Sequence, residues 1–80
     1  MQNQLEEIKK EVTKRIRLEF EKKFQGNKRQ FAKKAGCDEK TIRLLLDFGQ
    51  GMTLNLLFKL AFALDISASD LIKDLSLIEE

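Results

Sequence analysis

The chain has 80 residues, of which 42% are hydrophobic and 35% charged, and its formal net charge is +2. A chain of this length makes one small domain, and it contains no apolar run near the roughly 20 residues that a membrane-spanning helix needs. It has one Cys and no His, Pro, Trp or Tyr, which excludes an internal disulfide and leaves few ligands for a metal. We therefore expect a single cytoplasmic, all-α domain over residues 1–80, with no metal and no cofactor.

The charges divide the chain into two halves. Residues 1–36 hold eleven Lys or Arg against five Glu, a net of +6, whereas residues 37–80 carry a net of −4. A basic half can mark a face that binds a polyanion. Lysine-rich helices are also often only solvated surface, so both interpretations stay open.

The first predicted helix covers residues 3–25. Its length of roughly 35 Å, at about 1.5 Å per residue, exceeds what so small a core can cover. We expect residues 16–24 to pack on the domain, whereas the N-terminal extension 1–14 either projects or meets a partner. The apolar stripe that supports this helix recurs every three or four residues: Leu5, Ile8, Val12, Ile16, Phe20 and Phe24.

Two short helices are predicted within residues 27–47, joined at a glycine. Asn27 can cap the first and Asp38 the second, because such side chains accept bonds from the free N–H groups of a helix start. Gly36 lies where the first helix must end, and glycine takes the left-handed backbone there at no steric cost. This arrangement is typical of a helix-turn-helix motif. Its apolar faces are Phe31, Ala32 and Ala35 on the first helix, and Ile42, Leu45 and Leu46 on the second.

The rest of the chain is predicted to form a loop over residues 48–52 and two further helices. Thr53 can cap a helix over 54–65 that is apolar nearly all round, which is typical of a helix in the middle of a bundle. Ser67 can cap a fifth helix, residues 67–78. Cys37 is expected as a buried structural thiol. Aromatic residues at helical spacing are expected in the core: Phe20, Phe24, Phe31, Phe58 and Phe62, whereas Phe48 has no assigned role.

From Lys28 to Ile72 the sequence resembles the Cro/phage-repressor-type (XRE-like) helix-turn-helix family. The resemblance implies a five-helix repressor-like domain, and the predicted N-terminal helix exceeds the family's usual first helix by about ten residues. It also implies binding to double-stranded DNA, with the second helix of the motif in the major groove. The matching features follow one another in family order: Asn27-Lys28, Phe31-Ala32, Gly36, Asp38 to Ile42, Thr53 to Leu64, and Asp65 to Ile72.

Carried over position by position, the resemblance implies two sets of DNA contacts. Base edges would be contacted from the outer face of the second helix, where Arg43 or Lys40 can donate to guanine and Glu39 can accept from cytosine. Phosphates would be bound at the start of the first helix, where a cation and free N–H groups both favour an anion. The base-contacting set is Glu39, Lys40, Thr41, Arg43 and Leu44, and the phosphate-contacting set is Lys28, Arg29, Lys33, Gln50 and Thr53.

Some features of the motif depart from this pattern. The family often has Glu near the end of the second helix, Gly two residues later and Pro in the following loop, where this chain has Leu46, Phe48 and Met52. Glu39 can also pair with Arg43 one helical turn on instead of reading a base. The loop therefore has two interpretations, with or without the phosphate contacts of the family, and Glu39 also has two, as a base contact or as a partner of Arg43.

Two hypotheses about function follow. The first is a sequence-specific transcriptional regulator that binds DNA as a homodimer, formed through the helix 67–78 or through the N-terminal helix. The second is a protein-interaction module with the same fold, such as an antitoxin-like or modulator partner, with weak or no specific DNA binding. An enzyme is not expected, because the carboxylates are predicted on solvent faces and no catalytic residue can be assigned.

Overall fold

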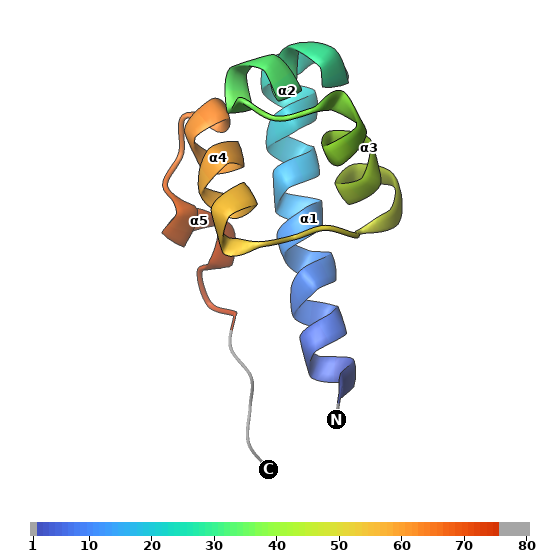
Figure 1. Cartoon of the computed structure of the whole chain (residues 1–80). Coiled ribbons are helices and arrows are strands. Elements are labelled where there is room, and N and C mark those ends of the chain that lie inside the picture. Colours follow the sequence, from blue (N-terminus) through green and yellow to red (C-terminus); the bar gives the residue numbers. More distant parts are fainter. Residues whose placement is uncertain (1, 76–80) are drawn as a thin grey trace.

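The computed structural model describes residues 2–75, and this part of the chain is all-α, with no strand. Most helix bounds agree with the predicted ones within a residue or two. Among the described helices, none combines the length and the apolar character that crossing a membrane requires. The helices, shown in Figure 1, are α1 (Gln2–Phe24), α2 (Lys28–Ala35), α3 (Glu39–Phe48), α4 (Leu54–Leu64) and α5 (Ala68–Ile72).

α1 runs through the centre of the fold, and each of the other four helices packs against it (Figure 1). Its buried stripe meets an aromatic side chain of α2. Phe31 is fully buried, and its ring centroid lies 5.1 Å from those of Phe20 and Phe24. This aromatic cluster anchors α2, and with it the helix pair α2–α3, on the second half of α1.

The first turns of α1 extend beyond the other helices (Figure 1). Leu5 is exposed, Ile8 is half-buried against the core, and Val12 is a core residue. The core therefore covers α1 from about Ile8 onward. The projecting part is shorter than the predicted extension 1–14, and Val12 is not available to a partner.

Three basic side chains of α1 donate hydrogen bonds to carbonyls at the ends of three other helices. The last carbonyls of a helix have no partner within it, and a cation there also complements the helix dipole. Three of the basic residues that give residues 1–36 their net positive charge thus stabilise the fold by capping other helices. The bonds run from Arg17 to Leu46 in α3, from Lys23 to Leu64 in α4, and from Arg15 to Leu71 and Lys73 at the end of α5.

α2 and α3 are joined by a turn of three residues, and the glycine has its predicted role. Gly36 is left-handed, with φ 75°, and its N–H donates to the carbonyl of Lys33. The Asn27 side chain caps α2 by accepting from the N–H of Gln30 at 3.0 Å. The predicted cap of α3 is wrong, because Asp38 has the extended backbone of a cap residue but its side chain accepts no capping bond.

The inward face of α4 differs from the predicted one. Thr53 caps the helix as expected, with its hydroxyl oxygen accepting from the N–H of Leu56 at 3.0 Å. Phe58 and Phe62, which we placed in the core, are 57% and 71% exposed. Because α4 is apolar on most of its surface, its sequence does not determine which face packs inward. The face centred on the fully buried Leu60 is the one that contacts α1, α2 and α5.

α5 is a single short helix and not the predicted helix of residues 67–78. The Ser67 hydroxyl caps it, accepting from the N–H of Asp70 at 3.2 Å. The helix ends at Ile72, after which Lys73 is extended and Asp74 is left-handed. Leu71 is buried, and the part of the predicted helix beyond residue 75 lies outside the described residues.

Candidate nucleic-acid interface

α3 presents a polar face to solvent. Its opposite face is buried through Ile42, Leu45 and Leu46, which fixes the rotation of the helix about its axis. Lys40 and Arg43, three residues apart, are exposed on the outer side. The other three predicted base contacts, Glu39, Thr41 and Leu44, are half-buried at the borders of this face. The structure thus brings all five together on one helix, with the two cations most accessible.

Arg43 already has a partner within α3. Its guanidinium donates to the Glu39 carboxylate at 3.0 Å, one helical turn earlier. Both side chains remain largely solvated, so the pair adds only a few tenths of a kcal/mol to the helix. The local pairing that the sequence left open is therefore formed in this structure. The pair engages the Nη2 group of the guanidinium, and a further acceptor would compete with Glu39 for that group.

If α3 binds DNA, changing Glu39 to Gln is expected to tighten that binding by about two- to fivefold, because it removes an anion from the DNA-facing side of α3 and releases the Arg43 guanidinium. It should also lower the free energy of unfolding by about 0.3–1 kcal/mol, since a carboxylate at a helix start complements the dipole. Fluorescence anisotropy with a selected duplex measures the first effect and urea unfolding the second.

Glu11→Gln is the matched control for Glu39→Gln. It breaks the equivalent pair with Arg15 on α1, which has a separation of 3.2 Å and the same i,i+4 spacing. This control should leave DNA affinity unchanged. Weaker binding by the Glu39→Gln variant would instead indicate that the Glu39 carboxylate accepts a bond from a base.

The start of α2 carries two of the predicted phosphate contacts. Lys28 is half-buried and Arg29 exposed in the first turn, whose N–H groups have no partner within the helix. Asn27 satisfies the N–H of Gln30, and the cations and remaining backbone donors favour an anion at this end. Lys33 is exposed near the other end of α2. Lys28 and Arg29 are both in the first turn, and Lys33 follows Arg29 at i,i+4 on the same side of α2.

The other two predicted phosphate contacts lie in the loop between α3 and α4. Gln50 is exposed, and it lines a groove that also contains Glu6 and Lys9 of α1. Thr53 is exposed as well, and because its oxygen accepts the capping bond, its hydroxyl hydrogen is free to donate to a phosphate. Gln50 is therefore placed by the end of α3, and Thr53 by the start of α4.

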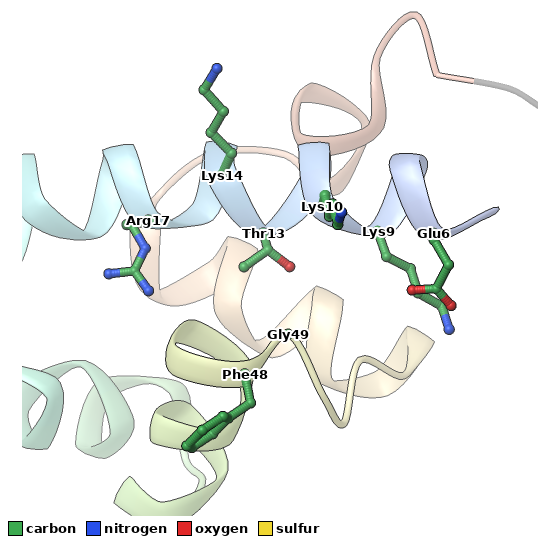
Figure 2. Close-up of a pocket in the computed structure, with 8 residues that line it drawn as sticks. All are labelled: Glu6, Lys9, Lys10, Thr13, Lys14, Arg17, Phe48 and Gly49. Carbon is green, nitrogen blue, oxygen red and sulfur yellow. The ribbon is translucent and has the colours of Figure 1, made fainter. Parts of the chain in front are cut away.

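A neighbouring groove of about 380 Å³ lies between the first half of α1 and the end of α3. In Figure 2, Arg17 and Thr13 point towards α3, whereas Lys14 points away from it. Phe48, whose role the sequence left open, is 67% exposed beside this groove. Four of the eight residues that line it are basic and one is acidic: Glu6, Lys9, Lys10, Thr13, Lys14, Arg17, Phe48 and Gly49.

The sequence-based site missed Lys9 and Lys10. They lie near the loop after α3, where the resemblance implies phosphate contacts. Because about 40 residues separate them from Gln50 along the chain, the sequence does not indicate that they are close to this loop. The one feature of the sequence that pointed to these two lysines was the net positive charge of residues 1–36. The groove contains one carboxylate, that of Glu6.

Cys37 lies in the turn between α2 and α3 and is half-buried, so the predicted buried thiol is correct only in part. Burial raises the pKa of this thiol, and the nearby Lys59 opposes that shift. The thiolate fraction at neutral pH is therefore small. Within the described residues, no three His, Cys, Asp or Glu side chains gather into a cluster that would hold a metal ion.

Comparison of the chain with protein-family models, with curated proteins and with solved structures found no significant match. We therefore base the proposed function on the geometry of the site.

Proposed function

We propose that the chain is a cytoplasmic, sequence-specific regulator that binds double-stranded DNA and reads the major groove with α3. One observation carries this proposal. α3 buries Ile42, Leu45 and Leu46 while offering Lys40 and Arg43 on the opposite face. An exposed helix of this length fits the major groove, where paired donors on Arg or Lys match the O6 and N7 acceptors of guanine.

The phosphate-binding surface is assigned to the start of α2 and to the loop after α3. The start of α2 supplies Lys28 and Arg29, and the loop after α3 supplies Gln50, with Lys9 of α1 beside it. Such contacts would hold the helix in register on the duplex while contributing no sequence information of their own. The basic residues that cap α3, α4 and α5 are excluded from this surface, because their donors are engaged with carbonyls.

The regulator is proposed to act as a homodimer. Two copies related by a twofold axis would place two α3 helices in successive turns of the major groove, about 34 Å apart. The preferred site is then an inverted repeat with half-sites roughly 10 base pairs apart.

Selection from a pool of random duplexes, carried out at low and at moderate salt, tests this function. We expect enrichment of an inverted repeat and, if the dimer neutralises about six phosphates, a slope near −5 for log K against log salt. Absence of enrichment together with absence of binding at low salt would contradict the proposal. Binding with a steep salt slope but without enrichment would limit it to non-specific DNA binding.

A second candidate function is a protein-interaction module, such as an antitoxin-like or modulator partner. It is favoured by the Glu39–Arg43 pair, which places an anion on the proposed reading face, and by the loop with Phe48 and Met52 in place of the family's Gly and Pro. Purification of the native protein from its host distinguishes the two. A stoichiometric protein partner in nuclease-treated material, without specific DNA binding, supports this second function.

A further inference from the structure

Three large apolar side chains stand along one ridge of α4. Leu54, Phe58 and Phe62 are 70%, 57% and 71% exposed, and they follow one another at intervals of four residues. Residues at this spacing form a continuous row on a helix surface. The opposite face of α4 is already buried against α1, α2 and α5, so this ridge is additional to the packing of the chain itself.

The ridge is comparable in area to the largest apolar patch on a typical monomer. From the usual area of such side chains, its three members expose about 400 Å² of apolar surface. The largest apolar patch on a typical monomer is about 300–600 Å² and often has a function. With a polar border, burial of the ridge would reach about 600 Å² on each copy, or about 1,200 Å² in total, which is the lower end of specific interfaces.

The polar border of the ridge suits a second copy of the same chain. Lys59 and Asp65 are both exposed in or just after α4, so the border carries one charge of each sign. Two copies that meet here bring two charges of each sign, which sum to zero, and an arrangement with Phe58 on the axis places the two Lys59 side chains nearer the axis than the two Asp65 side chains. A polyanion would find no positive field on this face, which separates the ridge from the proposed DNA surface on α3.

We propose that the chain forms a twofold homodimer in which α4 packs against α4 of a second copy along the ridge of Leu54, Phe58 and Phe62. In an antiparallel arrangement Phe58 lies near the axis, and each Leu54 meets the partner's Phe62. Ridges of residues spaced by four interdigitate at a crossing angle of about −50°, the commonest helix packing. The face of α3 that carries Lys40 and Arg43 stays free in this dimer.

This interface differs from the two seams that the sequence suggested. The first of these, in α1, loses Val12 to the core. The second was assigned to a helix of residues 67–78, of which the structure describes only Ala68–Ile72 as helical. The α4 interface stands independently of DNA binding, and its test contains no DNA.

Sedimentation equilibrium of the full chain, from about 1 µM to about 1 mM, tests the dimer. The wild type should move from 9.3 kDa towards twice that mass as concentration rises. Phe58→Glu should raise the dissociation constant about 30-fold or more, since it places a charge at the centre of the interface. Circular dichroism confirms that the variant is folded, which we expect because Phe58 is exposed.

Leu18→Glu is the matched control, because Leu18 is 59% exposed on α1 and lies outside the ridge. It should dimerise like the wild type. A wild type that stays monomeric throughout the range would overturn the proposal. So would a Phe58→Glu variant that dimerises as well as the wild type, or a Leu18→Glu variant that alone becomes monomeric.

A disulfide test reports on the geometry of the interface. In a Cys37→Ser background, Phe58→Cys places a thiol near the proposed twofold axis, where it can join its own counterpart. Mild oxidation should give a covalent dimer, whereas Phe48→Cys, also exposed but outside the ridge, should remain mostly monomeric. Equal cross-linking of both variants would contradict the α4 interface.

Discussion

Replacing Phe31 with Ala is expected to lower the free energy of unfolding by about 3–5 kcal/mol. Phe31 is fully buried, and its ring stacks against Phe20 and lies beside Phe24, so its removal leaves a cavity between α1 and α2. Small domains have a total stability of about 5–15 kcal/mol, and one of 80 residues belongs near the lower end. The variant should therefore keep only about 0–2 kcal/mol of stability, so that up to about half of it is unfolded without urea.

Urea unfolding followed by circular dichroism at low protein concentration measures the effect of Phe31→Ala. Phe48→Ala serves as the control, because the same substitution at a side chain that is 67% exposed removes few contacts and should cost under about 1 kcal/mol. A loss below about 1 kcal/mol for Phe31→Ala would show that the aromatic cluster does not hold α2 on α1.

Replacing Arg43 with Ala should weaken binding to the selected duplex by about 10- to 150-fold and relax the preference at one base position in each half-site. The reason is the loss of a bidentate donor to guanine, which is worth about 1–3 kcal/mol. Lys28→Ala should act differently. It should weaken binding to all sequences alike and make the salt slope shallower by about one unit per lost phosphate contact.

Lys73→Ala is the control for both DNA-binding variants, since it removes an equal charge from an exposed residue just after α5, a helix that does not contact α3. Its affinity should stay close to that of the wild type. An Arg43→Ala variant that loses affinity equally for every sequence would show that this residue binds phosphate. Unchanged binding by all three variants would place the DNA surface elsewhere on the chain.

Local chemistry accounts for the parts of the fold that the sequence predicted well. The caps at Asn27, Thr53 and Ser67 and the left-handed Gly36 depend on residues within a few positions of one another. Two features need the packed structure. α4 is apolar on most of its surface, so only its neighbours determine that Leu60 faces inward and Phe62 outward. The end of α5 likewise depends on Arg15, which is 58 residues from Lys73.

The candidate site follows the same division. Exposure of Lys40 and Arg43 is implied by the apolar face of α3, because period and burial together fix which side chains point outward. The pair between Glu39 and Arg43 is also local, and the sequence offered it as an alternative. The grouping of Lys9 with Gln50 required the path of the loop across α1, which no short-range pattern contains.

The three capping bonds from α1 bear on how the domain unfolds. Arg17, Lys23 and Arg15 each connect α1 to the last turn of a different helix. If α1 separates, the ends of α3, α4 and α5 lose their donors in the same event, and the core stripe of α1 is exposed with them. Partial opening is therefore costly in this region, and α1 couples the remaining helices into one cooperative unit.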